Sequence, residues 1–209
     1  LVGSEMCIRD SNKLAQEGIS KSDVEGVGIG VPGPVRSDGV VNGCVNLGWG
    51  VINVAEELGA QTGLKVKVGN DANVAGLGEM WQGGGKGYSN LVAVTLGTGV
   101  GGGIIIDGRI LTGTNGAGGE IGHIHIEDAE TETCGCKNKG CLEQYASATG
   151  ITRLANRRLA KDDAPSMLRG GEISAKTVFD AVKAGDKVAI EIAEQFGEYL
   201  GKGLAAVAS

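Results

Sequence analysis

Three cysteines and a histidine in the middle of the sequence have the spacing of a metal site. Cys134 and Cys136 are separated by one residue, Cys141 follows after four more, and His123 lies eleven positions before Cys134. Three thiolates and one imidazole are the donor set of a closed, tetrahedral zinc site. The segment between the cysteines is too polar to fold by burial, and a bound metal would supply its order. These residues predict structural Zn²⁺, with three reduced surface cysteines as the alternative.

The second histidine of the sequence, His125, is a rival for the fourth ligand position. If this segment is extended, His123 and His125 point to the same side of the chain. The choice between them stays open at this point. Cys7 and Cys44 lie elsewhere in the sequence and are expected to be plain thiols.

A glycine-rich stretch between two apolar segments predicts a strand, a loop that binds phosphate, and a second strand. Val92–Leu96 alternates branched apolar residues, and Ile104–Ile106 is continuous and β-branched. Between them lie five glycines and Thr98, whose backbone N–H groups can form an anion-binding nest. The glycines also fit a dinucleotide fingerprint, but a strand rather than a helix is expected to follow them. A glycine-rich hairpin without a ligand is the alternative.

Several carboxylates and amides are placed for acid–base chemistry or for binding hydroxyl groups. Asp71 lies between a strand and a helix, where catalytic groups of α/β folds gather, and it is the candidate general base. Asn70 and Asn73 can hold sugar hydroxyls or the aspartate, and an Asx turn that caps the helix is the alternative. Glu120 and Glu143 flank the cysteine segment, where they are either hydroxyl acceptors or solvated surface charges.

The expected elements alternate strands with helices, which predicts an α/β fold. In chain order we expect a strand over Val24–Val31, a polar loop over Asn42–Trp49, a helix over Asn53–Thr62, a strand over Lys65–Val68 and then a helix to about Trp81. After the cysteines we expect helices over Ile151–Ala160 and Ser174–Ala184, and a long one from Asp186 with Ile192, Phe196, Leu200 and Leu204 on one face.

The expected organisation is two incomplete α/β lobes. Residues 1–11 fit nothing downstream and are interpreted as a non-native scar; residues 12–88 form a small lobe and residues 89–209 a large lobe with the zinc loop. The net charge of −6, the absence of a basic run and an aromatic content of 3% argue against nucleic acid as a partner. No apolar run is long enough to span a membrane, and the cytoplasm is the expected compartment.

The motifs described above resemble those of the ROK family (repressors, open reading frames and sugar kinases). The resemblance covers about Val24–Gly150 and more loosely the rest. It is carried by Leu96-Gly97-Thr98-Gly99-Val100-Gly101-Gly102-Gly103, by Gly119-Glu120-Ile121-Gly122-His123, and by the segment Cys134–Glu143. Asn46-Leu47-Gly48-Trp49 and Gly69-Asn70-Asp71-Ala72-Asn73 look most like the glucokinases of that family.

The resemblance implies an actin/hexokinase-like (ribonuclease H-like) ATPase fold with two lobes around a cleft, and phosphoryl transfer from Mg-ATP to the 6-hydroxyl of glucose. Carried over by residue, it implies Asp71 as the base; Asn46, Asn70, Glu120, His123 and Glu143 as sugar contacts; Gly97, Thr98 and Gly99 as the phosphate loop; and His123, Cys134, Cys136 and Cys141 as zinc ligands. It also suggests a homodimer or homotetramer.

The sequence departs from the family pattern at both ends. The Asp-x-Gly-Gly-Thr phosphate motif of the first strand is absent, as are the glycine motif near the adenine and the final helix. We therefore expect little or no turnover from this chain alone. A sugar-sensing repressor, or a kinase for N-acetylmannosamine, N-acetylglucosamine or fructose, are the competing interpretations.

Overall fold

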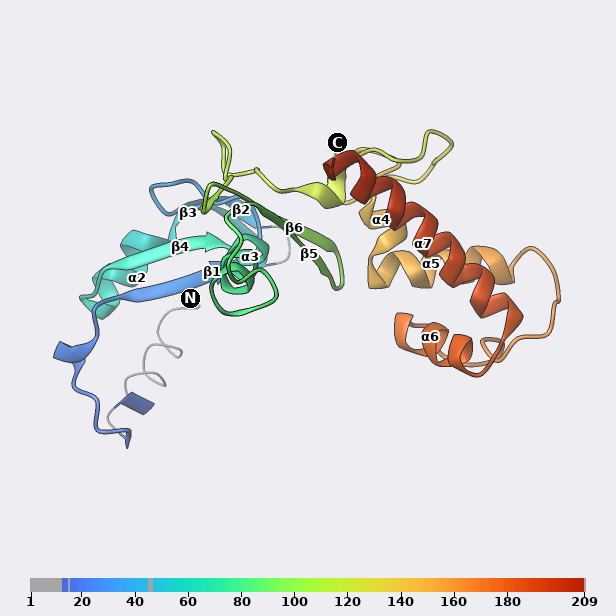
Figure 1. Cartoon of the computed structure of the whole chain (residues 1–209), viewed down its shortest axis with the longest axis horizontal. Coiled ribbons are helices and arrows are strands. Elements are labelled where there is room, and N and C mark those ends of the chain that lie inside the picture. The colour runs from blue at the N-terminus through green and yellow to red at the C-terminus, as the bar shows by residue number, and fades with distance from the viewer. Residues whose placement is uncertain (1–12, 15, 45–46, 209) are drawn as a thin grey trace. The chain divides into compact units, whose positions relative to one another are not determined.

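The structure is a computed structural model that describes residues 13–14, 16–44 and 47–208 (Figure 1). Asn46 and the segment 1–11 lie outside the described residues, so the predictions made for them stay predictions. The described chain divides into two compact units. The first comprises the residues up to Ala93 together with Gly103–Gly119, and the second comprises Val94–Gly102 and the residues from Glu120 onward.

The first unit is built from strands and helices in the expected α/β order. Its strands are β1 (Val27–Val31), β2 (Val40–Cys44), β3 (Trp49–Asn53) and β4 (Val66–Asn70), and its helices are η1 (Lys21–Asp23), α2 (Val54–Thr62) and α3 (Asp71–Gln82). β1 and β4 are parallel, with Val31 opposite Asn70, so that the end of β1 lies beside the start of α3.

The expected polar loop over Asn42–Trp49 is shorter than predicted. β2 and β3 form an antiparallel hairpin in which Val41 pairs with Ile52 and Cys44 pairs with Trp49. Val41 is fully buried, and it packs with Val31, Val35, Cys44 and Val54 in the core of this unit. Burial of one face of the hairpin therefore extends the strands into a segment whose composition alone indicates a loop.

The predicted strand, glycine loop and strand are confirmed as β5 (Leu91–Leu96) and β6 (Val100–Ile106), with β7 (Arg109–Ile110) beside β6. The second strand begins earlier than expected, so Gly101, Gly102 and Gly103 belong to β6 and not to the loop. A Cβ at Gly103 would lie 3.0 Å from the Ala72 carbonyl oxygen and 3.3 Å from Cα of Asn73. Glycine is thus present in this strand because the start of α3 packs directly on its backbone.

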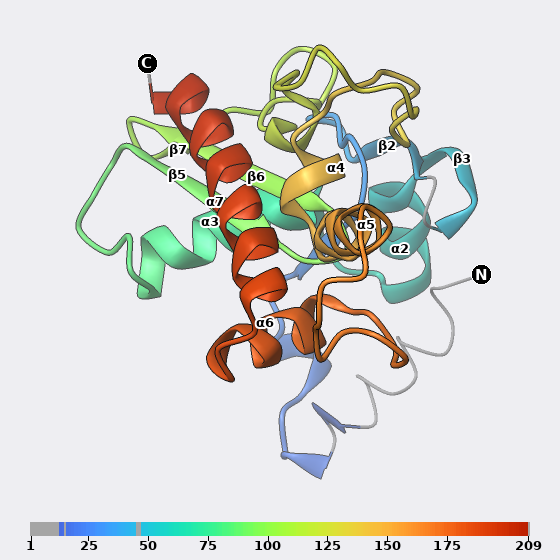
Figure 2. The same cartoon turned by 90° about the vertical axis from the view of Figure 1, so that its right-hand side faces the viewer.

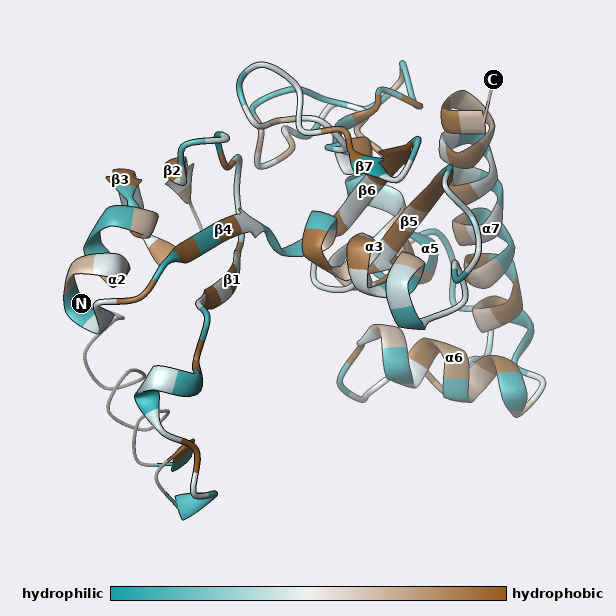
Figure 3. Cartoon of the chain, turned by 60° about the vertical axis from the view of Figure 1, so that its left-hand side comes forward, coloured by the Kyte–Doolittle hydropathy of each residue, from teal (hydrophilic) through white to brown (hydrophobic). Residues whose placement is uncertain are grey.

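The second unit is mostly helical after the cysteine segment (Figure 2). It contains η3 (Ile121–His123), α4 (Glu143–Ala146), α5 (Ala148–Leu159), α6 (Ala175–Lys183) and α7 (Lys187–Ala208). Ser147 and Ser174 are the N-caps of α5 and α6, and each side chain accepts a hydrogen bond from the backbone three residues later. Polar and apolar residues mix along α5, α6 and α7, as the hydropathy colouring shows (Figure 3).

The long last helix buries the expected face over its first turns and departs from it toward its end. Ile192 is fully buried and Phe196 packs against the same core, but Leu204 is 41% exposed. Successive steps of four residues drift by about 40° each on a helix of 3.6 residues per turn, so Leu204 has turned about 120° away from Ile192. Tyr199 and Gly203 continue the buried face instead, and a Cβ at Gly203 would lie 2.5 Å from Cδ2 of Leu142.

Among the helices that the structure describes, none combines the length and the apolar character that a bilayer crossing requires.

Because α3 packs directly on the backbone of β6, we predict that adding a methyl group at Gly103 destabilises the protein. Gly103→Ala should lower the free energy of unfolding by about 1–3 kcal/mol, because its methyl group overpacks a backbone contact. Gly78→Ala is the matched control, since Gly78 lies within α3 and a Cβ there meets nothing within 4 Å. It should leave stability unchanged or raise it by up to about 1 kcal/mol. Urea unfolding measures both, and equal effects of the two substitutions would contradict the packing described here.

Candidate functional site

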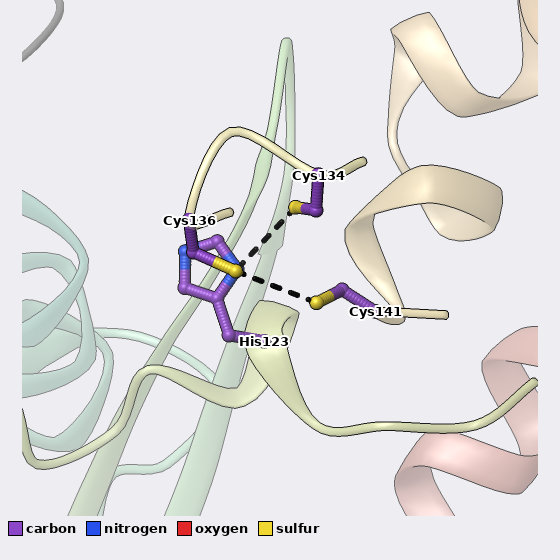
Figure 4. Close-up of side chains that lie close together, drawn as sticks. All are labelled: His123, Cys134, Cys136 and Cys141. Atoms are coloured by element: carbon purple, nitrogen blue, oxygen red, sulfur yellow. Dashed lines mark hydrogen bonds between the residues drawn. The ribbon is translucent and has the colours of Figure 1, made fainter. Parts of the chain in front are cut away.

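Four side chains of the second unit that could hold a metal ion converge in the structure (Figure 4). The ligand atoms of His123, Cys134, Cys136 and Cys141 all lie within 4.8 Å of one another. Cys134 Sγ lies 3.8 Å from His123 Nδ1, and Cys136 Sγ lies 3.5 Å from Cys141 Sγ. With zinc–sulfur bonds of about 2.3 Å, two thiolates bound to one tetrahedral ion are about 3.8 Å apart. The group therefore fits a zinc ion in both donor type and spacing.

Tight turns bring the three cysteines together. The Cys134 amide donates to the Asn138 carbonyl at 2.7 Å, and the Lys137 amide donates to the Cys134 carbonyl at 2.8 Å. Lys137 has a positive φ of 71° within this turn. Gly140 has a φ of 70°, and a Cβ there would lie 2.1 Å from the Glu127 carbonyl oxygen. The polar loop thus folds on backbone hydrogen bonds and one required glycine.

Without a bound metal, the three thiols differ in their pKa values. Burial raises the pKa of Cys134, and burial together with the neighbouring cysteines raises the pKa of Cys141 to about 12. Burial opposes ionisation of Cys136 as well, but hydrogen bonds from the Asn138 amide and the other two thiols lower its pKa. A coordinated metal deprotonates such thiols outright, so zinc would supply the charge that stabilises them as thiolates.

Of the two histidines, the structure places His123 beside the three cysteines and not His125. The segment is not extended at this point, because Ile121–His123 forms a 3₁₀ turn. His125 is 55% exposed at its side chain, and its Nε2 lies 2.8 Å from Asp128 Oδ1. Its Nδ1 lies 2.8 Å from the Lys139 carbonyl oxygen. These two hydrogen bonds, that to Asp128 first, raise the pKa of His125.

The carboxylate of Glu143 links the metal-binding group to the glycine turn between β5 and β6. Its Oε2 accepts a hydrogen bond from the Val100 amide at 3.0 Å, and its Oε1 lies 3.9 Å from Cys134 Sγ. A Cβ at Gly99 would lie 2.3 Å from that Oε2 atom. Gly99 is therefore required for the close approach of a carboxylate to the turn.

The start of α5 holds the same turn from another side. The Ala148 amide donates to the Gly97 carbonyl at 2.8 Å, and the Thr149 hydroxyl donates to the Thr98 carbonyl at 2.9 Å. The Gly97 amide donates to the Gly99 carbonyl at 3.0 Å. The amides of Gly97 and Val100 already donate hydrogen bonds within the protein. The predicted anion nest is therefore limited to the backbone amides of Thr98 and Gly99. The two α5 contacts were missed by sequence reasoning, because nothing in the local pattern marks them.

In the first unit, the helix cap and the candidate base fall on different residues. Asn70 is the N-cap of α3, with its Oδ1 accepting from the Asn73 amide at 3.0 Å and its Nδ2 donating to the Gly33 carbonyl at 3.2 Å. Asp71 is the first helical residue and is exposed, and its Oδ1 accepts from the Ala72 amide at 2.9 Å. The Asx cap weighed against a catalytic role thus belongs to Asn70, which leaves the Asp71 carboxylate at the positive end of the helix.

The remaining predicted sugar contacts stay predictions. Glu120 is half-buried and lies immediately before the 3₁₀ turn that carries His123. Glu143 and His123 lie in the same unit, on the two sides of the cysteine segment.

Comparisons with known proteins agree with the motifs. Residues 12–209 match the ROK family. A relative from Halalkalibacterium halodurans named glucokinase is 43% identical over 195 residues, which cover 91% of this chain and 59% of the relative. The chain thus spans about three fifths of the length of the curated relatives it matches.

Two solved structures show the same fold. A ROK family glucokinase from Streptomyces griseus, in complex with glucose and AMPPNP, matches with a TM-score of 0.79 and 34% identity, over 99% of this chain and 68% of that chain. A ROK family transcriptional regulator, homologous to the E. coli MLC protein, matches with a TM-score of 0.84 and 32% identity, over 99% of this chain and 52% of that chain. These matches confirm the expected actin/hexokinase-like α/β fold.

The choice between the two histidines is directly testable. His123→Asn and Cys136→Ser should each reduce the zinc content of the purified 209-residue chain well below one ion per chain, because each removes a ligand of the group. His125→Asn is the matched control and should retain its zinc. Elemental analysis after dialysis measures all three. Full zinc content in the His123 variant, or loss in the His125 variant, would contradict the assignment.

Proposed function

This chain belongs to the ROK family, and we propose that the protein phosphorylates glucose at its 6-hydroxyl with Mg-ATP as the phosphoryl donor. The similarity to a relative named glucokinase supports the sugar and the reaction. The similarity to a structure that contains glucose and AMPPNP supports ATP as co-substrate. The observation that carries the proposal is the exposed Asp71 carboxylate at the start of α3. Asn70, and not Asp71, caps this helix.

Asp71 is the general base of the proposed reaction. Phosphoryl transfer needs a positioned nucleophile and neutralised phosphate charge more than it needs covalent catalysis. A carboxylate within hydrogen-bond reach of the 6-hydroxyl accepts its proton as the oxygen attacks the γ-phosphorus, an effect of about 10²–10⁴ in rate. Asn70 supports this carboxylate by fixing the first turn of α3 against the Pro32-Gly33-Pro34 loop through its bond to Gly33.

The proposed sugar contacts are Asn46, Asn70, Glu120, His123 and Glu143. His123 can bind a metal ion and contact a sugar at the same time. Its Nδ1 lies near Cys134 Sγ, and its Nε2 can make a separate hydrogen bond. A zinc-bound imidazole donates its second N–H to an acceptor, and a sugar hydroxyl is a suitable one. In this proposal the zinc ion has a structural role: it fixes the loop whose ends carry Glu120, His123 and Glu143.

The glycine turn is the proposed phosphate contact. Gly97, Thr98 and Gly99 are held by α5 and by Glu143, so the turn is fixed before ATP binds. Backbone N–H groups held in this way stabilise charge that develops on the transferring phosphoryl group without reorganising at the moment of reaction. The Mg²⁺ that accompanies ATP would neutralise the remaining phosphate charge.

A sugar-responsive transcriptional regulator is the second candidate, because a regulator of this family matches the chain with a TM-score of 0.84. Such a protein binds sugar without turnover, so the two candidates differ in ADP release and not in sugar binding. A kinase for another hexose would keep the mechanism and change the substrate. We further propose that the protein acts in the cytoplasm as a homodimer or homotetramer.

The first test is ADP release by the protein in its full natural length, with Mg-ATP and a panel of hexoses. Release with glucose well above that with N-acetylglucosamine, N-acetylmannosamine and fructose is the expected result. Higher release with one of the other sugars would change the substrate, and sugar binding without any release would favour the regulator.

The second test concerns the base. In the same full-length protein Asp71→Asn should lower kcat by about 10²–10⁴, because the amide cannot accept the hydroxyl proton. Glucose affinity, measured by calorimetry, should change little, because the substitution preserves shape. Asp107→Asn, in the turn after β6, is a matched control with no expected effect. Retained turnover in the Asp71 variant would remove this residue as the base.

A further inference from the structure

A buried carboxylate in the cysteine loop has no role in the function proposed above. The Glu130 side chain is 1% exposed and lies between His123 and Cys134, in the segment 124–141 that we call the cysteine loop. It accepts hydrogen bonds from Arg157 at 3.0 and 3.1 Å, from the Tyr145 hydroxyl and from Arg153. The Glu132 amide donates to it at 2.8 Å. Burial raises the pKa of Glu130, but the bonds from Arg157, Tyr145 and Arg153 hold that pKa well below its usual range.

A buried ion group of this kind needs a reason other than stability. Moving charges from water into the protein interior costs free energy, and pairing them there often does no more than offset that cost. What such a group does supply is a single geometry, because a planar guanidinium and a carboxylate pair in few orientations. The structure therefore favours a positioning role for Glu130 and the two arginines: they fix the segments of the chain that they connect.

Arg153 joins Glu130 to the short helix that carries Glu143. Its Nη1 donates to the Gln144 carbonyl at 3.0 Å, and its Nε donates to Glu132 Oε2 at 3.0 Å. Gln144 in turn donates from Nε2 to the Glu132 carbonyl at 3.0 Å. One guanidinium thus holds both the loop and the residue next to Glu143.

The helix that carries Glu143 is too short to fix its own position. α4 spans only Glu143–Ala146, and the side chain of its N-cap, Leu142, makes no capping hydrogen bond. On one side it follows Cys141, a member of the metal-binding group, whose amide donates to Gln144 Oε1 at 3.1 Å. On the other side it is held through Arg153. The buried residues Leu142, Tyr145 and Ala146 pack this segment into the core, and the cysteine group and Arg153 add two polar supports next to Glu143.

We propose that Glu130 and Arg153 are positioning residues that fix the Glu143 carboxylate against the glycine turn and toward a sugar hydroxyl. The first part of this proposal rests on the contacts described here, and the sugar part rests on the proposed function. Arg158 provides the matched control. It lies on the same helix α5 and pairs with Glu191 and Asp162 at 2.5 and 3.0 Å, both outside the cysteine loop and α4.

The positioning role is tested without activity by amide exchange at Val100, whose N–H donates to Glu143. In the 209-residue chain, Arg153→Gln should speed exchange of this amide about tenfold or more relative to the native chain, whereas Arg158→Gln should not. Glu130→Gln, which keeps the shape and removes the charge, should act in the same direction as Arg153→Gln. Arg153→Lys keeps the positive charge but loses the planar guanidinium with its several N–H donors, so it should give an intermediate exchange rate. This variant also tests the proposal if Arg153→Gln does not fold.

The sugar role is tested separately in the full-length protein. Arg153→Gln should raise KM for glucose about tenfold with a smaller change in kcat, because a contact made in both ground and transition states is weakened. Equal exchange rates at Val100 in the Arg153 and Arg158 variants would overturn the positioning role. Faster exchange with unchanged KM for glucose would retain the positioning role and overturn Glu143 as a sugar contact.

Discussion

The hydrogen bond from the Val100 amide to the Glu143 carboxylate is the interaction on which the candidate site of the second unit depends. At 3.0 Å it joins residues that are 43 positions apart, and it ties the glycine turn to the cysteine loop. A hydrogen bond to a charged group contributes about 1.5–3 kcal/mol, and this one also fixes where the carboxylate lies. Gly99 is required for it, because any Cβ there would occupy the place of the carboxylate oxygen.

The rest of the candidate site consists of contacts that fix short segments in place, because these segments are too short to be fixed by their own backbone hydrogen bonds. The four-residue helix α4 is supported by the metal-binding group and by Arg153, and the glycine turn is supported by the start of α5. In the first unit Asn70 carries out the capping and the tie to Gly33, so that Asp71 can remain exposed. In each case a structural residue adjoins the residue for which we propose chemistry.

The sequence was sufficient where the signal is local. The spacing of Cys134, Cys136 and Cys141 predicts a group that could hold a metal. The helices expected from Asn53 and from Ser174 begin directly after these two residues, which are their N-caps. These signals succeed because a cap or a ligand pair acts over a few residues.

Local patterns fail where packing or backbone conformation decides. A 3₁₀ turn selects His123 over His125, and an alternation rule that assumes an extended chain cannot detect it. The drift of α7 exposes Leu204. The glycines Gly101–Gly103 belong to β6, where Gly103 allows the backbone of α3 to approach. The Glu130 cluster joins residues up to 27 positions apart, for which the sequence carries no periodic signal.

In the proposed function, the cysteine loop organises the groups that bind the sugar, and a bound metal ion holds that loop. Calorimetric titration of glucose into the full-length protein, once loaded with zinc and once depleted by a chelator, tests it most directly. We predict an affinity at least about tenfold weaker in the depleted protein, with recovery on adding zinc back, because the loop that places Glu143 loses its metal support. Equal affinity in the two forms, with zinc loss verified by elemental analysis, would contradict the account.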